Sequence, residues 1–133
     1  MKTRQPLHLI QKLNLWGNDL HDVSILKNLQ SLEVLALTVN QITTMKDFSN
    51  LYNLRELYLR RNYIPPDLME LRYLSGLKNL KVLNLGENPM SAEHGGIPFY
   101  RSVVLKHLPW LEKLDDTPVT YEEVQMAQEI DIE

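Results

Sequence analysis

The stretch Leu57-Tyr58-Leu59-Arg60-Arg61-Asn62 decides the fold, because its pattern Leu-x-Leu-x-x-Asn occurs four times in the chain. The other copies end at Asn18, Asn40 and Asn88, so that successive asparagines are 22, 22 and 26 residues apart. Side chains alternate along a strand, and both leucines of the pattern therefore point to the same side of a short strand. A repeat of this length indicates a solenoid in which each unit packs on the next.

The full unit reads Leu-x-x-Leu-x-x-Leu-x-Leu-x-x-Asn-x-Leu/Ile, which is typical of a leucine-rich repeat. We expect one domain over residues 1–133, with repeats at about 7–28, 29–50, 51–76 and 77–107 and a cap at about 97–130. Parallel strands are expected at 12–16, 34–38, 56–60 and 82–86. The predicted fold class is α/β: a right-handed leucine-rich-repeat solenoid with a concave parallel β-sheet and a helical C-terminal cap.

The asparagine that ends each pattern turns the chain away from the strand. Its side chain can hydrogen-bond main-chain groups of the turn and of the neighbouring coil, so the four asparagines are expected to form a ladder. A role as ligand contacts is the alternative, but the ladder already accounts for all four positions.

Two further regions are predicted to be helical. A short helix on the convex side is expected within residues 64–74, because Pro65 and Pro66 can begin a helix and three leucines follow at helical spacing. Near the C-terminus a helix at 100–105 is ended by Pro109, and a strand-like piece follows at 111–115. Thr120 and Glu123 form a capping-box pattern, which predicts a last helix at 121–130. Four leucines are expected to cover the last repeat: Leu105, Leu108, Leu111 and Leu114.

Composition narrows the class of protein. The chain has no cysteine, whereas extracellular leucine-rich repeats usually carry disulfide-bonded caps, so an intracellular location is expected. The N-terminal apolar stretch, residues 7–10, is too short for a signal peptide or a membrane helix. Residues 1–111 carry 13 basic and 9 acidic side chains (+4), while residues 112–133 carry 1 and 8 (−7). The acidic end reads as a solvated terminal helix and argues against nucleic-acid binding.

No pattern in the chain indicates catalysis. The histidines His8, His21, His94 and His107 are scattered, without partners at metal-ligand spacing. The pair Asp115-Asp116 belongs to the predicted cap, and Gly95-Gly96 lacks the Lys-Ser/Thr of a phosphate loop. We therefore expect a protein that is not an enzyme and that has no catalytic residue, cofactor or metal site.

The C-terminal segment carries a family resemblance. Tyr100-Arg101 through Val104-Leu105, then Leu108-Pro109 with Leu111 and Leu114-Asp115, and Val119-Thr120 with Glu122-Glu123, resemble the cap of SDS22-like leucine-rich repeats. That family includes a phosphatase regulator, a spliceosomal component and several axonemal or basal-body proteins. The cap resemblance implies the predicted fold but does not select one function.

A closer resemblance covers nearly the whole chain and is most specific at Trp16-Gly17, at residues 58–62 and at residues 87–89. The chain is similar there to the repeat domain of a family of cilium- and flagellum-associated proteins. This resemblance implies protein binding in the cytoplasm and cytoskeleton at the base of the cilium or flagellum (the basal body), and a role in cilium biogenesis. It also implies a NimA-related kinase complex as partner of the full-length protein.

Alternation along the strands exposes the residues between the leucines on the concave face. Five of the residues there or just beyond are predicted to bind a protein partner, because Trp, Tyr and Arg are enriched in interface hot spots: Trp16, Tyr58, Arg60, Arg61 and Tyr63. The structural alternatives are that Trp16 covers the end of the first repeat and that the arginines pair with Glu56 and Glu87. The expected function is a protein-interaction module of a ciliary scaffold. The alternative is docking on a ribonucleoprotein or phosphatase complex. Membrane insertion is not expected, and the repeat domain alone is expected to be monomeric.

Overall fold

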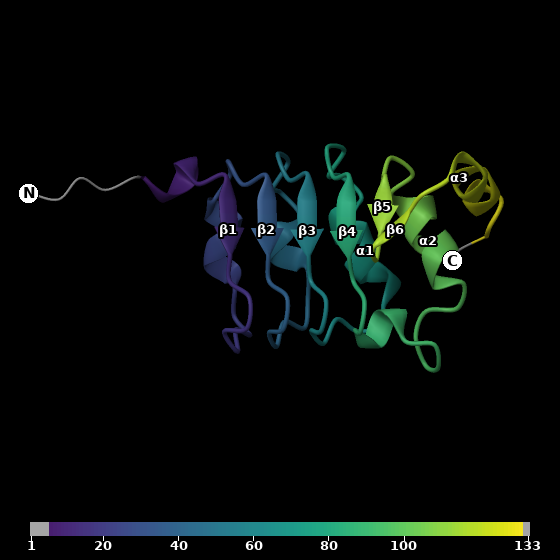
Figure 1. The fold of residues 1–133 in the computed structure, drawn as a ribbon, viewed down its shortest axis with the longest axis horizontal. Helices are drawn as coiled ribbons and strands as arrows, with labels where there is room; N and C mark the ends of the chain where they lie inside the picture. The colour runs from purple at the N-terminus through teal and green to yellow at the C-terminus, as the bar shows by residue number, and fades with distance from the viewer. Residues whose placement is uncertain (1–5, 132–133) are drawn as a thin grey trace, which may run out of the picture.

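The computed structural model describes residues 6–131 and consists of one curved sheet with helices stacked behind it. The strands follow chain order in the sheet: β1 (Lys12–Asn14), β2 (Val34–Ala36), β3 (Glu56–Tyr58), β4 (Val82–Asn84), β5 (Lys113–Leu114) and β6 (Thr117–Pro118). The strands β1 to β5 pair in parallel, as Figure 1 shows by their common direction. The fold is therefore the predicted α/β leucine-rich-repeat solenoid.

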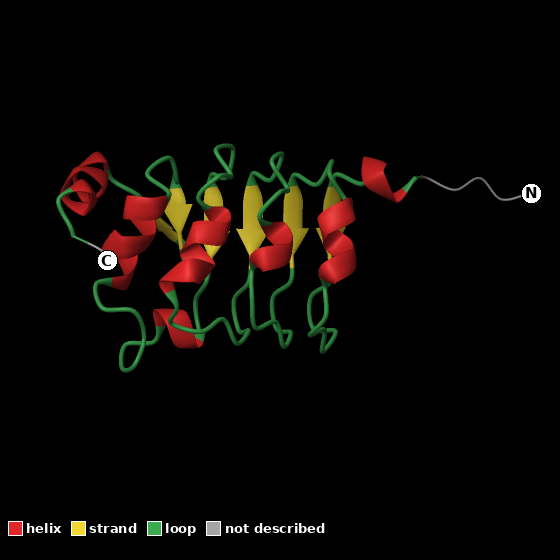
Figure 2. Cartoon of the chain, turned by 180° about the vertical axis from the view of Figure 1, so that it is seen from behind, coloured by secondary structure: helices red, strands yellow, loops and turns green. Residues whose placement is uncertain are grey.

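Most of the helices lie behind the sheet, on its convex side (Figure 2). Four of them are short 3₁₀ helices: η1 (Leu7–Leu9), η2 (Ser24–Asn28), η3 (Lys46–Phe48) and η4 (Pro89–Ser91). Three are α-helices: α1 (Leu68–Leu74), α2 (Tyr100–His107) and α3 (Tyr121–Gln128). The lengthened third repeat thus contains the expected convex helix, whose N-cap is Asp67, because the Asp67 side chain accepts a hydrogen bond from the Met69 N–H.

The strand register places equivalent leucines side by side. Leu13 pairs with Leu35, Leu35 with Leu57, Leu57 with Leu83, and Leu83 with Leu114. The last four of these leucines are completely buried, whereas Leu13 is only half-buried. The leucine columns are therefore the core of the solenoid, and they become more exposed toward its N-terminal end.

The asparagine ladder is present in three of the four repeats. The Asn62 side chain accepts from the Ile42 N–H at 3.0 Å and donates to the carbonyls of Leu37 and Leu59, both at 3.0 Å. Asn40 and Asn88 make the equivalent bonds, and all three are buried. The prediction is wrong for Asn18, which is exposed and whose side chain donates to Trp16 O in its own turn. Among residues 6–131 no earlier repeat lies beside it to supply carbonyls.

The strands are shorter than predicted, with three residues each in β1 to β4 where five were expected. Main-chain bonding nevertheless continues between repeats, since the Leu59 N–H donates to Asn84 O and the Arg61 N–H to Gly86 O. The Gly86 N–H does not take part in this pairing and donates to the Asn84 side-chain oxygen at 2.9 Å. Gly86 therefore lies outside the regular strand β4, which ends at Asn84.

The C-terminal cap differs from the prediction in two details. The strand-like piece at 111–115 forms a hairpin, in which β6 runs antiparallel to β5 around Asp115 and Asp116, both with positive φ. The last helix begins at Tyr121 with the expected capping box of Thr120 and Glu123 but ends at Gln128, two residues early. Each difference concerns residues at the end of the stack, where the repeat pattern no longer fixes the backbone.

Candidate functional site

The predicted residues are displayed as the alternation rule requires. Leu57 and Leu59 are completely buried, while Tyr58 between them is half-buried and Arg60 is exposed. Arg61 is also exposed and takes φ 60°, in the turn that leads away from β3. Val39 and Glu87 occupy the same left-handed position before Asn40 and Asn88. This repeated turn aims Arg61 and Glu87 toward each other from neighbouring repeats.

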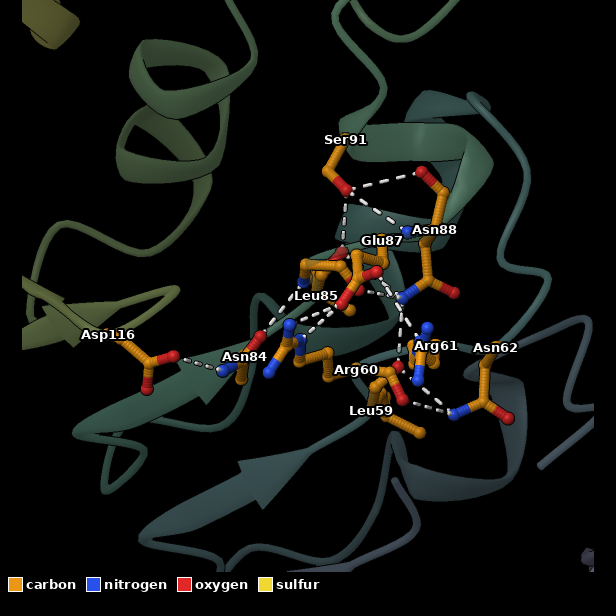
Figure 3. A network of polar contacts seen from close by, with 11 residues as sticks. Leu59, Arg60, Arg61, Asn62, Asn84, Leu85, Glu87, Asn88, Ser91 and Asp116 are labelled. Carbon is orange, nitrogen blue, oxygen red and sulfur yellow. Dashed lines mark hydrogen bonds and ion pairs between the residues drawn. The ribbon is translucent and has the colours of Figure 1, made fainter. Parts of the chain in front are cut away.

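A single carboxylate holds the two arginines together (Figure 3). Glu87 Oε2 lies 2.5 Å from Arg60 Nη2 and accepts from Arg60 Nε at 2.6 Å, while Glu87 Oε1 lies 3.4 Å from Arg61 Nε. All three side chains remain about half exposed, at 52%, 62% and 45% for Arg60, Arg61 and Glu87. Surface pairs of this kind add only about 0–1 kcal/mol to stability, so their main effect is to orient the guanidiniums.

The adjacent glycine leaves room for the Asn84 side chain. A Cβ at Gly86 would lie 3.1 Å from the Asn84 side-chain oxygen, which is a tight contact, and 3.7 Å from Arg60 Cγ, which is an ordinary one. A larger residue at this position would therefore press on the Asn84 amide. Two guanidiniums facing one carboxylate leave this cluster with a net charge of +1, and each arginine keeps N–H groups that a partner can use.

Tyr58 is held by the acidic residues around it. Its hydroxyl donates to Glu56 Oε1 at 2.5 Å, and the neighbouring Asn84 side chain donates to Asp116 Oδ2 at 3.3 Å. Partial burial, the hydrogen bond to Glu56 and the charge of Asp116 together raise the pKa of Tyr58 to about 12. The hydrogen bond to Glu56 orients the tyrosine ring beside the arginines.

The structure also decides between the alternatives raised for these side chains. The arginines do pair with Glu87, as one of the alternatives stated, but Glu56 binds Tyr58 and not an arginine. Trp16 is 62% exposed, so most of its side chain faces solvent. Tyr63 is 59% exposed and follows the ladder residue Asn62, beyond the end of β3.

Small side chains separate Trp16 from the Tyr58 cluster. Ala36 pairs with both Asn14 and Tyr58 in the sheet register, and the Thr38 carbonyl accepts from Gly17 while Val39 N–H donates to Arg60 O. Adjacent strands lie about 4.8 Å apart, so β1 and β3 are about 10 Å apart. Trp16 and Tyr58 therefore lie on either side of the small side chains of β2, and the space between them can accept an element of a partner.

Three residues of the site were missed in the sequence. Asn84 and Asp116 contribute polar groups beside Tyr58, and Gly86 leaves room for the Asn84 amide. Strand alternation places Asn84 and Gly86 on this face, so their position was predictable although they were not among the predicted contacts. Asp116 could not, because it reaches the concave face through the β5–β6 hairpin, which the repeat pattern does not encode.

The side chains on this face offer hydrogen-bonding groups, charge and aromatic surface. Within residues 6–131 no group of three or more His, Asp or Glu side chains is arranged to hold a metal ion. Over the same residues, no helix has the length and apolar character needed to span a bilayer.

Comparison with known proteins agrees with the fold. The family model described as leucine rich repeat matches residues 8–64. The chain has the leucine-rich-repeat fold. This chain is 51% identical over 122 residues to human cilia- and flagella-associated protein 410. The aligned segment covers 91% of this chain and 46% of the human protein. The mouse protein of the same name is 47% identical over 121 residues, covering 91% of this chain and 47% of the relative.

The leucine-rich-repeat chain therefore spans less than half the length of these relatives. Among solved structures, the crystal structure of the Drosophila melanogaster SNF/U2A′ complex contains a chain with the same fold. The TM-score is 0.70 at 24% identity, over 89% of this chain and 79% of that one. At this level of identity the likeness concerns the fold alone.

Proposed function

We propose that this chain is a non-enzymatic protein-interaction module of a ciliary or basal-body scaffold and that it binds a protein partner through its concave face. The contact residues are Trp16, Tyr58, Arg60, Arg61 and Tyr63. The observation that carries the proposal is the cluster in which Glu87 holds both arginines beside the fixed ring of Tyr58. The concave sheet of a leucine-rich repeat is an extended binding surface, and Arg and Tyr are frequent interface hot spots.

The cellular setting follows from the relatives. Two curated proteins that share about half of their aligned residues with this chain are named for cilia and flagella. We infer a location in the cytoplasm at the base of the cilium, and a NimA-related kinase complex as partner of a full-length protein of this kind. We further propose that residues 1–133 act as one monomeric domain with no nucleic-acid partner.

The test is proximity labelling in ciliated cells with the intact protein and a double variant, Arg60→Glu with Arg61→Glu. We expect the double variant to lose its main labelled partners and its enrichment at the ciliary base. Its melting temperature should change little, because surface substitutions usually alter stability by about 0.5 kcal/mol or less.

Two controls separate recognition from general charge effects. Lys27→Glu with Lys46→Glu makes the same change of charge on exposed residues of the helical face. Arg60→Glu with Arg61→Glu and Glu87→Arg restores opposite charges within the cluster while inverting its sign. The proposal requires that the lysine variant keep its partners and that the triple variant, although folded, lose them. Unchanged partners in the double and triple variants would refute the concave-face proposal.

A further inference from the structure

An apolar pocket of about 390 Å³ is lined by residues other than those of the concave cluster. It lies beside the loop that joins η4 to α2, which Figure 1 shows in green at the lower right, and it is shared with the start of α1 and the end of the chain after α3. Its apolar lining includes Pro66, Leu68, Ile97, Pro98, Phe99 and Ile130. The volume falls in the usual range of ligand pockets, about 300–1,000 Å³.

Phe99 at the mouth of this pocket is unusual in two ways. The residue is 80% exposed although it is a large aromatic, and it takes φ 53° and ψ 40°. The other non-glycine residues with positive φ among 6–131 lie in the repeat turns or in the β5–β6 hairpin. A bulky side chain in this region costs roughly 1–3 kcal/mol and persists where the surroundings impose it. The fold thus holds a phenyl ring at the pocket without burying it.

The loop in front of Phe99 gives access to the main chain. Gly96 allows a close turn, because a Cβ there would lie 2.4 Å from the Ala92 carbonyl oxygen. Gly95 has φ 83° and no atom within 4 Å of its missing Cβ position. The peptide groups at Gly95 are therefore reachable from solvent, as in sites that hydrogen-bond the backbone of a bound segment.

The charges near the pocket are acidic. Asp131 lines it, and Asp67 stands between the lining residues Pro66 and Leu68. Glu93 and Glu129 lie within two residues of the lining, and all four carboxylates are exposed.

The basic residues of the same region are directed elsewhere. Arg101 binds Glu123 and donates to the carbonyls of Leu114, Thr117 and Pro118. Lys106 donates to the Gln128 carbonyl at the end of α3 at 2.6 Å. Both are committed to the cap. Arg72 of α1 and His94 of the loop are further basic residues close to the lining in sequence, but among residues 6–131 the one charged residue that lines the pocket itself is Asp131.

We propose that this pocket is a second docking site, which takes a polypeptide segment with aliphatic side chains flanked by lysine or arginine. The aliphatic side chains enter the pocket and are covered by Phe99, the flanking cations meet the acidic rim, and Gly95 bonds the backbone of the segment. A fatty acid or an anionic membrane would bring negative charge to the same carboxylates and is disfavoured. The site is separate from the concave face and does not depend on it.

The test uses the whole chain and two peptides of defined sequence. The first is acetyl-Lys-Arg-Leu-Ala-Ala-Leu-Arg-Lys-amide, and the second replaces its four cations with Glu and Asp. Titration followed by nuclear magnetic resonance should show saturable shifts of the Gly95 and Gly96 amides with the basic peptide. The acidic peptide should bind at least tenfold more weakly, as estimated from the same resonances.

The variant Phe99→Gly separates binding from folding. Glycine accepts positive φ, so this change should leave the melting temperature equal or higher while weakening the basic peptide at least tenfold. Asp131→Lys should weaken it too, and Met126→Ala, which removes an exposed apolar side chain of α3 outside the pocket, should have no effect.

Several results would overturn the proposal. These are equal binding of both peptides, full affinity in folded Phe99→Gly, or shifts confined to the Tyr58 region. Saturation of the pocket by phosphatidylserine vesicles with no response to the basic peptide would also overturn it, as would self-association that buries the pocket at the concentrations used. None of these results bears on the arginine variants, so the two binding proposals fail independently.

Discussion

The two ends of the solenoid have the same repeat, but the C-terminal end is covered by further elements and the N-terminal end is more exposed. At the C-terminal end Leu83, Leu85 and Leu114 are completely buried beneath α2 and the β5–β6 hairpin. At the N-terminal end Leu13 and Leu15 are only half-buried, and in η1 Leu7 and Leu9 are 58% and 52% exposed. Figure 1 shows the same contrast, with β5, β6, α2 and α3 beyond β4 at one end and the short η1 beyond β1 at the other.

The contrast shows that a leucine-rich repeat is stabilised by its contact with a neighbouring unit. Each repeat buries its leucines and pairs its main chain only where a neighbour is present. The same asparagine is therefore buried with three or more bonds at Asn62 and exposed at Asn18. The last repeat acquires its neighbour from the cap, where Arg101 ties α2 to α3 and to the hairpin.

Removal of the cap should produce the largest effect. A fragment ending at residue 90 exposes the leucine column of β4 and leaves its sheet edge open, which favours aggregation. We expect this fragment to be unfolded or aggregated by circular dichroism and size-exclusion chromatography. A fragment starting at residue 11, which lacks η1, is the matched control and should remain folded. A monomeric 1–90 fragment with a cooperative melt near that of the full chain would show that the cap is not needed.

The ladder offers a single-residue form of the same comparison. Asn62→Ala leaves the buried Ile42 N–H without its partner, while the Leu37 and Leu59 carbonyls each keep one bond, from Asn40 and Asn88. A buried unpaired group costs about 1–3 kcal/mol, so a loss of about this size in unfolding free energy is expected. Asn18→Ala should change it by less than about 0.5 kcal/mol. Urea denaturation measures both, and equal losses would contradict the account of the two ends.

A smaller effect should appear in the pH dependence of the cap. The hydrogen bond from Arg101 lowers the pKa of Glu123, so on acidification the unfolded chain takes up this proton before the folded one. Its stabilisation is complete above the ordinary carboxyl pKa of about 4.3 and is lost as the pH falls toward the lowered value.

The variant Glu123→Gln keeps the capping box but has no proton to take up. Between about pH 5 and 3 its melting temperature should fall less than that of the natural chain. Burial raises the pKa of Asp115 and of Glu70, which acts in the opposite direction, but equally in both proteins, so the difference isolates Glu123. Parallel pH profiles would show that the Arg101 contact does not stabilise the cap.

Much of the fold could be predicted from the sequence because the same pattern occurs in it several times. Four copies of one pattern determine the strand register, the inward leucines and the outward position of Tyr58 and Arg60. The capping box of α3 was equally accessible, because it depends on two residues three positions apart. These features share a local or periodic cause.

The features that were not predicted depend on contacts between residues far apart in the sequence, which no local pattern indicates. The hairpin at Asp115 and Asp116 exists because the last strand must close the sheet, and through it Asp116 meets Asn84 from 32 positions away. The failure at Asn18 has the same origin, since its sequence matches the other three but its surroundings differ. The arginines were expected, as the structural alternative, to pair with Glu56 and Glu87; they pair with Glu87, and Glu56 accepts from Tyr58 instead.

The central claim, that the concave face binds the partner, is tested most directly by hydroxyl-radical footprinting of the natural protein with and without a captured partner. Trp16 and Tyr63 are exposed within the proposed contact, and Tyr52 and Tyr121, which are 55% and 74% exposed, lie outside it. We predict that the partner lowers the oxidation rate of Trp16 and Tyr63 and leaves Tyr52 and Tyr121 unchanged. Protection of Tyr52 or Tyr121 with Trp16 and Tyr63 still fully reactive would contradict the claim and move the interface to another face.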